Sequence, residues 1–187
     1  SAEVAVIGDF ESCYYHAVQD YNGGLASYIA TSNQTLEIQR AGIVFDSYSF
    51  ADIDNPALQK YKMFIFPQLF YMTPEKQAKL STLKKSGKTL VFLNAAGWLT
   101  PDGTSQDSVI ETTGINVKVL DNASSLRTTI TQGANRGKTM ENSGKFYPVL
   151  QINDAQASVR GTVVLQGSGK TVTEKINKYA VGFVLSG

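Results

Sequence analysis

Three short segments that carry only apolar side chains constrain the fold of this chain more than any other feature. Val4–Ile7, Met63–Phe66 and Leu90–Leu93 each end at a glycine, a proline or an asparagine. A strand that is apolar at every position is buried on both faces, as strands of parallel sheets are. Segments with helical periodicity lie between them. We therefore predict an α/β fold in which helices cover both faces of a mostly parallel sheet.

Residue types that cap helices mark where the predicted helices begin and end. Thr73-Pro74-Glu75 places a capping hydroxyl before a proline at the first helical position and an acid in the first turn. Gly87 ends this helix, and Gly114 ends a shorter one. In the first half we expect strands at residues 4–7, 61–67, 89–93 and 115–120, and one that begins with residues 43–45. We expect helices at residues 14–21, 25–41, 74–86 and 107–113.

The second half of the chain has a different character. From Ser125 onward, segments rich in threonine, valine and glycine alternate without a convincing helix. We therefore divide the chain into an α/β core of residues 1–124 and a β-rich extension of residues 125–187, packed on the core or extending it. Strands are predicted in the extension at residues 128–131, 146–152, 162–166, 171–176 and 179–185.

The composition limits the classes of protein to which the chain can belong. Hydrophobic residues make up 42% of the chain and charged residues 18%, which suits a domain with a core and is too little charge for disorder. The net charge is +1 without a basic tract, so we expect no nucleic-acid and no membrane partner. No apolar stretch approaches the roughly 20 residues of a membrane span, and no signal peptide precedes the first strand. The localisation stays open, and both ends are typical of a segment of a longer protein.

Three Gly-Lys-Thr triplets do not have the surroundings of a nucleotide-binding loop. Such a loop needs a further glycine five positions before the glycine of the triplet, a strand before it and a helix after it. For the triplets that begin at Gly87, Gly137 and Gly169, the positions five residues earlier hold Thr82, Gln132 and Val164. We therefore expect no nucleotide, and no other cofactor is indicated.

Few residues could support nucleophilic catalysis. His16 is the only histidine and Cys13 the only cysteine, and their spacing puts them on one face of the first helix. They form either a catalytic dyad or, more commonly for a helix packed on a sheet, two core or edge residues. A single cysteine also excludes a disulfide framework and a Cys-rich zinc site. We predict no catalytic residue and no metal site, and a hydrolase or amidotransferase is the least favoured alternative.

Polar and aromatic side chains follow the predicted strands at their carboxyl ends, where ligands bind in open parallel sheets. Asp9 and Glu11 follow the first strand and form either an acid/base pair or, more commonly, solvated loop carboxylates. Aromatic rings beside amides and carboxylates suit a sugar, and they suit a protein interface equally well. The candidate ligand-binding residues are Asp9, Glu11, Gln68, Tyr71, Asn94, Gly97 and Trp98. The candidate interface residues are the aromatics Tyr14, Tyr15 and Phe70, with Tyr71 and Trp98 also expected to be exposed.

The order and spacing of several segments resemble a known family. Residues 60–73 combine a tyrosine-lysine pair, an apolar strand, a proline, an apolar loop and a helix start. Residues 86–97 form a glycine-containing strand and loop, and residues 4–12 and 110–115 fit the same pattern. Over about residues 3 to 120, the chain resembles the trimerisation domain of β-galactosidases, which has a glutamine-amidotransferase-like fold.

The resemblance implies a flavodoxin-like, three-layer α/β sandwich beside the barrel of a glycosidase. In such enzymes this domain contributes to subunit association, and the catalytic carboxylates belong to the barrel. Amidotransferases carry a cysteine at a turn that corresponds here to Ala95-Ala96-Gly97, where this sequence has none. We therefore expect a non-catalytic oligomerisation or scaffold domain of a larger glycoside hydrolase, whose partners are further copies of itself and the catalytic domain. A small-ligand or carbohydrate-binding module is the alternative.

Overall fold

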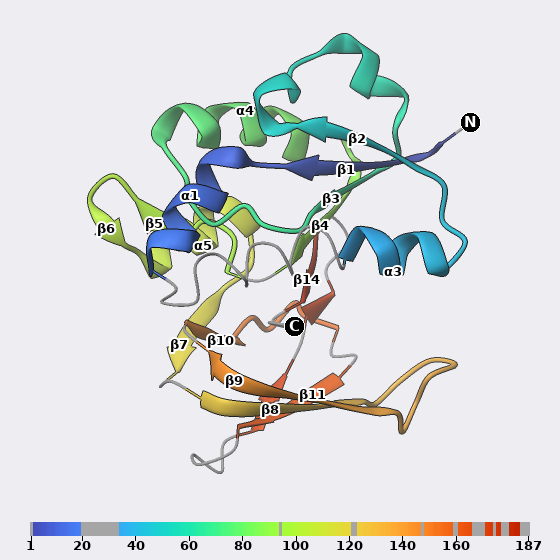
Figure 1. The fold of residues 1–187 in the computed structure, drawn as a ribbon, viewed down its shortest axis with the longest axis vertical. Coiled ribbons are helices and arrows are strands. Elements are labelled where there is room, and N and C mark those ends of the chain that lie inside the picture. The colour runs from blue at the N-terminus through green and yellow to red at the C-terminus, as the bar shows by residue number, and fades with distance from the viewer. Residues whose placement is uncertain are drawn as a thin grey trace.

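The computed structural model combines an α/β part with a β-rich part (Figure 1). The residues that it describes are 2–19, 34–93, 95–120, 123–146, 148–158, 161–165, 171–173, 175–176 and 180–183. In the view of Figure 1 the α/β part lies above and the antiparallel strands of the second half lie below.

A six-stranded sheet forms the centre of the α/β part. Its strands are β1 (Val4–Gly8), β2 (Phe45–Ser49), β3 (Met63–Phe66), β4 (Thr89–Leu93), β13 (Lys175–Ile176) and β14 (Ala180–Phe183). The strand order is β13-β14-β4-β3-β1-β2, and every pair from β14 to β2 is parallel. A parallel order with β1 between β2 and β3 is one of the common orders of doubly wound sheets. The prediction of a mostly parallel sheet in an α/β fold is confirmed.

Helices pack on both faces of this sheet. They are α1 (Phe10–Gln19), α3 (Gln34–Arg40), α4 (Pro74–Lys84) and α5 (Gln106–Thr113), with short 3₁₀ helices η2 (Phe50–Asp52) and η3 (Pro56–Lys60). On one face Phe66 and Phe92 stack with ring centroids 5.1 Å apart, inside a large buried cluster that includes residues of α4 and α5. On the other face Ile38 of α3 packs against Ile65 and Val91. None of the helices among the described residues has the length and apolar character to cross a membrane.

Local signals place the ends of α4 and α5 where the sequence predicts them. The Thr73 hydroxyl caps α4 by accepting a hydrogen bond of 3.2 Å from the Lys76 N–H. Ser105 caps α5 in the same way. Gly114 ends α5 in the left-handed conformation, with φ 70°, which a glycine adopts without strain.

The strand predicted at residues 115–120 is present, but it does not belong to the parallel sheet. β7 (Val117–Leu120) instead pairs antiparallel with β10 (Val149–Ile152), outside the central sheet. β14, close to the end of the chain, takes the place beside β4. Val117, Leu150 and Ile152 are buried in the same cluster as the sheet, so the β7–β10 ribbon is an apolar layer on the core. Apolar residues indicate that a strand is buried but not which strand it pairs with.

The second half forms its own antiparallel sheet. Its strands are β8 (Ala123–Ile130), β9 (Thr139–Phe146), β11 (Gly161–Leu165) and β12 (Thr171–Thr173), and β5 (Leu99–Thr100) and β6 (Gly103–Thr104) form a separate small hairpin. The order of the sheet is β12-β11-β8-β9. The sequence missed β9, since its mostly polar side chains show no alternation and its pairing with β8 defines it. β2 begins at Phe45 rather than at Ile43, and the domain division at residue 124 stays a prediction.

Gly97, in the loop after β4, packs closely against α5. Its φ is 82°, and a Cβ atom there would lie 2.2 Å from the Thr112 Oγ1 and 2.9 Å from the Ser108 carbonyl oxygen. Gly103 also has a positive φ, of 114°, but nothing lies within 4 Å of the position of its Cβ. The two glycines therefore separate the effect of crowding from that of backbone strain.

We predict that Gly97→Ala lowers the free energy of unfolding by about 2–4 kcal/mol, because steric overlap adds to left-handed strain. Gly103→Ala is the matched control and should cost about 1–2 kcal/mol, from strain alone. Urea unfolding followed by circular dichroism measures both. Equal losses would show that the close approach of this loop to α5 contributes nothing.

Candidate functional site

The loops after β3 and β4 meet at the carboxyl edge of the sheet and bond to each other. The Gly97 N–H donates to the Leu69 carbonyl at 2.7 Å, and the Leu99 N–H donates to the Phe70 carbonyl at 3.0 Å. In return, the Met72 N–H donates to the Leu99 carbonyl at 2.8 Å. The pairing of the two strands therefore continues into the described part of their loops.

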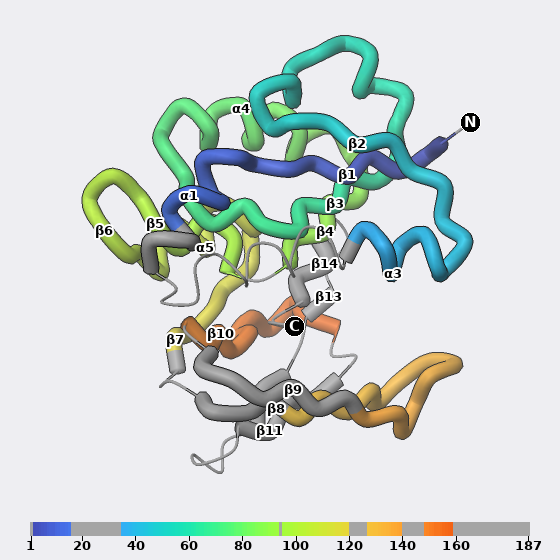
Figure 2. Tube along the Cα trace, in the orientation of Figure 1, coloured from blue at the N-terminus to red at the C-terminus, as the bar shows by residue number. Residues whose placement is uncertain are grey.

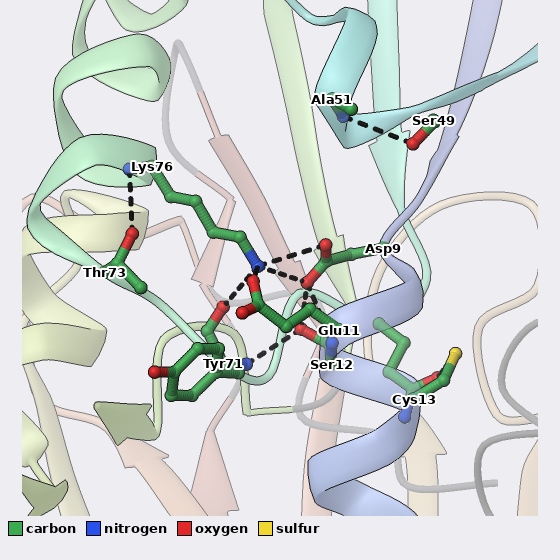
Figure 3. Close-up of polar contacts among 10 residues, drawn as sticks. Asp9, Glu11, Ser12, Cys13, Ser49, Ala51, Tyr71, Thr73 and Lys76 are labelled. Atoms are coloured by element: carbon green, nitrogen blue, oxygen red, sulfur yellow. Dashed lines mark hydrogen bonds and ion pairs between the residues drawn. The ribbon is translucent and has the colours of Figure 1, made fainter. Parts of the chain in front are cut away.

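Lys76 of α4 lies between two carboxylates at the same edge (Figure 3). Its Nζ is 2.9 Å and 3.1 Å from the two carboxylate oxygens of Asp9, and 2.8 Å from a carboxylate oxygen of Glu11. It also donates to the Tyr71 carbonyl at 3.3 Å. The side chains of Asp9 and Lys76 are only 8% and 13% exposed, so each charge depends on the other for compensation.

Ser12 connects this ion pair to the backbone. Asp9 directly precedes α1 and accepts a hydrogen bond of 3.1 Å from the Ser12 N–H, the contact of a helix N-cap. The Ser12 hydroxyl donates to the same Asp9 oxygen and accepts from the Tyr71 N–H at 2.8 Å. One chain of contacts thus joins the end of β1, the first turn of α1, the loop after β3 and α4.

Two tyrosine rings lie over this cluster. Tyr15 of α1 stacks on Tyr71 with ring centroids 4.1 Å apart, and the Lys76 ammonium lies 5.3 Å from the centre of the Tyr71 ring. Burial, followed by the hydrogen bond with Tyr15, raises the pKa of the Tyr71 phenol.

Most of the predicted ligand-binding residues are buried rather than open to a ligand. Asp9, Gln68, Tyr71 and Trp98 are all below a tenth exposed, and Gln68 accepts a hydrogen bond from the Cys13 thiol at 3.3 Å. The interpretation of Asp9 as a solvated loop carboxylate is wrong, because Lys76 and Ser12 cover it. Gly97 packs on α5, Glu11 is half-exposed, and Asn94 lies outside the described residues.

The expected exposure of three aromatics is also wrong. Phe70, Tyr71 and Trp98 are 3%, 7% and 5% exposed and belong to the large buried cluster. The paired loops fold their rings into the core instead of presenting them to solvent. By contrast, Tyr14 is 75% exposed and Tyr15 40%, as an interface would require.

Ser12, Lys76 and Phe10 are the important residues of this region that the sequence analysis missed. The spacing from Asp9 to Ser12 is that of a helix cap and its first-turn partner, so this signal was available. Phe10 is 77% exposed at the start of α1, next to the candidate carboxylates. Lys76 gave no signal, because 67 residues separate it from Asp9 in the sequence.

A second polar cluster lies on β2 and before β3. The Tyr61 hydroxyl donates to the Asp46 carboxylate and lies 2.8 Å from the Tyr48 hydroxyl, and Tyr61 is completely buried. Burial, followed by the bond to Asp46, raises the pKa of the Tyr61 phenol. The same hydrogen bond lowers the pKa of Asp46.

The chemistry of the carboxyl edge is that of a structural cluster. Asp9 has both carboxylate oxygens bonded to groups inside the protein, and the hydroxyl of Ser12 is used both as donor and as acceptor. Within the described part of the chain, no group of three or more His, Cys, Asp or Glu side chains is placed to hold a metal ion. The side chain of His16 lies outside what the structure describes.

No family model and no curated protein matches this sequence, whereas solved structures match its fold. A catalytic mutant of Gan42B, a GH42 β-galactosidase from G. stearothermophilus, superimposes with a TM-score of 0.71 at 19% identity. The β-galactosidase from Rahnella sp. R3 superimposes with a TM-score of 0.68 at 15% identity. The chain has the fold of a region of these β-galactosidases.

The superpositions cover very different shares of this chain and of the β-galactosidases. The matches cover 98% of this chain but only 27% of Gan42B and 28% of the Rahnella protein, so the chain spans about a quarter of their length. A ThuA-like protein from Bacteroides uniformis matches with a TM-score of 0.61 at 11% identity, and 81% of that protein is covered. Identities this low establish the fold alone.

We predict that Lys76→Met lowers the free energy of unfolding by about 3 kcal/mol, because Asp9 is left buried without its cation. Glu11→Gln is the matched control, since it removes only the half-exposed carboxylate, and should cost less than about 1 kcal/mol. Adding Asp9→Asn to Lys76→Met should recover part of the loss. Urea unfolding at neutral pH compares the variants, and a Lys76→Met variant as stable as Glu11→Gln would contradict the role given to this ion pair.

The Tyr61 cluster predicts a loss of stability at alkaline pH. The folded state holds the Tyr61 proton more tightly than the unfolded state, so the free energy of unfolding should fall as pH rises above the ordinary tyrosine pKa of 10.0. Tyr61→Phe removes this proton, and its stability should change less between about pH 9 and about pH 11. Denaturant titrations across this range test the prediction, which parallel curves for the two proteins would contradict.

Proposed function

We propose that this chain is a non-catalytic scaffold domain of a larger glycoside hydrolase of the β-galactosidase type. It would have an amidotransferase-like fold, mediate the association of subunits and lie beside the catalytic domain. The observation that carries the proposal is the unequal coverage, in which nearly the whole chain corresponds to about a quarter of each β-galactosidase. A chain of this extent corresponds to one part of such an enzyme. Most of the length of the enzyme then belongs to other domains.

The closed carboxyl edge supports this proposal. Doubly wound proteins that bind ligands do so outside the carboxyl ends of their strands. In this chain the loops there are paired with each other, and Asp9, Lys76 and Ser12 are engaged with one another. A domain with this edge filled by its own side chains acts more readily through its outer surface.

The exposed aromatics of α1 support the same proposal. Phe10 and Tyr14 are each about three-quarters exposed, on consecutive turns of one helix. Large aromatic side chains are enriched in protein interfaces. The alternative of a carbohydrate-binding module loses support, because four of the side chains named for it, Asp9, Gln68, Tyr71 and Trp98, are buried.

We expect the 187-residue chain to self-associate, with a molar mass above that of the 20.3 kDa monomer that rises with protein concentration. Multi-angle light scattering over a hundredfold range of concentration measures this. Calorimetric titration with galactose and with lactose should show no saturable heat. A strict monomer that binds either sugar saturably would contradict the proposal and favour the binding module.

A further inference from the structure

Four side chains form an exposed, acidic and aromatic patch on the first turns of α1. Phe10 and Tyr14 are four residues apart, as are Glu11 and Tyr15, so the two pairs form adjacent rows on the helix surface. The three aromatic rings are 77%, 75% and 40% exposed in chain order, and the Glu11 side chain is 50% exposed. We call these four residues the α1 patch.

The α1 patch carries an excess of negative charge. Beneath it, the single ammonium of Lys76 is shared between the carboxylates of Asp9 and Glu11, so the three groups together hold one more negative than positive charge. Lys76 and the Tyr15–Tyr71 stack also hold Glu11 and Tyr15 in place. Aromatic faces attract cations, and guanidinium groups stack on them while pairing with a neighbouring carboxylate. The patch is therefore complementary to exposed arginine or lysine side chains.

The turn between β8 and β9 provides such side chains. Residues 131–138 are ordered by backbone hydrogen bonds, including those from the Gly137 N–H to the Ile130 carbonyl at 2.8 Å and from the Lys138 N–H to the Asn135 carbonyl at 3.1 Å. Arg136 and Lys138 are exposed. Residues 127–139 contain no acidic residue, and none of the ion pairs between described side chains involves Arg136 or Lys138.

The α1 patch and this hairpin tip lie on opposite sides of the molecule. In Figure 2, α1 is on the left of the α/β part, whereas the tip extends to the right below it. The same separation is visible in the ribbon of Figure 1. The two surfaces therefore do not meet within one copy of the chain, whereas they can meet between two copies.

We propose that the β8–β9 hairpin tip of one copy binds the α1 patch of a second copy, with Arg136 stacked on the exposed rings and paired with Glu11. The proposal rests on the proposed function, because it assigns the surfaces through which the chain self-associates. Since two different surfaces meet, the interface is heterologous, and repetition produces a closed ring or an open chain of copies. The four residues of the patch and the eight of the tip are far fewer than the roughly 20–30 residues that each partner contributes to a stable interface. Each contact is accordingly weak and sensitive to protein concentration and to salt.

The test is a charge swap in the full 187-residue chain, followed by light scattering and sedimentation equilibrium. Arg136→Glu and Glu11→Arg should each weaken self-association by about tenfold or more, because each places like charges opposite one another. The double variant, which exchanges the two charges, should regain most of the wild-type association. Lys118→Glu is the matched control: it makes the same charge change on an exposed residue of β7 and should leave association unchanged.

The outcomes separate this inference from the proposed function. One outcome is that the wild type associates and that Arg136→Glu and Lys138→Glu associate as strongly as the wild type. Association then uses another surface, so the proposed interface is wrong while the scaffold function stands. If the wild type is monomeric at every concentration, both are wrong. Glu11 contacts Lys76, so thermal unfolding must first establish that Glu11→Arg is folded. If Glu11→Arg does not fold, the variants Arg136→Glu and Lys138→Glu, which lie far from the core, test the proposed interface by themselves.

Discussion

The ammonium of Lys76, held between Asp9 and Glu11, is the interaction on which the rest of this structure depends. It brings together the end of the first strand, the first turn of α1, the loop after β3 and the first turn of α4. A lysine and an aspartate that are both nearly buried are stable only together, so these four elements have one arrangement in which the charges are compensated. Ser12 extends the same arrangement to the backbone of Tyr71.

Closing the carboxyl edge in this way changes what the fold can do. The same sheet order binds ligands in other proteins at the ends of its strands. Here that space holds the chain's own aromatic rings and two loops that pair with each other. The proposed scaffold role therefore uses the exposed rings of α1 and the basic hairpin tip instead of this edge.

The parts of the fold that were predicted correctly are those that local sequence patterns determine. The caps of α4 and α5 lie within a few residues of the helices they define. The strands with only apolar side chains indicate by their composition that both of their faces are buried. The position of β14 beside β4 depends on a contact between residues about ninety apart, for which no local pattern exists. The same reason explains why β7 was assigned to the wrong sheet, since its apolar residues are equally well buried against β10.

The sequence indicated which side chains gather at the carboxyl edge, but not whether they face solvent or one another. Asp9, Glu11, Gln68 and Tyr71 do gather at one edge of the sheet, as parallel strands require. Whether such residues face solvent or one another depends on Lys76, which is remote in sequence, and on the pairing of two loops. A tyrosine or tryptophan after a strand has no feature that distinguishes an exposed ring from a buried one. Exposure could be anticipated only for Tyr14 and Tyr15, which are on the outer side of a helix.

A closed carboxyl edge and association through the outer surfaces make different predictions for backbone amides in different parts of the chain. Amide hydrogen exchange, measured by residue at low and at high protein concentration and with galactose added, tests both most directly. We expect the amides of Tyr71, Gly97 and Leu99 to be protected under every condition. Only α1 and the β8–β9 hairpin should gain protection at high concentration. Edge amides that exchange rapidly in the free chain and become protected when galactose is added would contradict a closed edge.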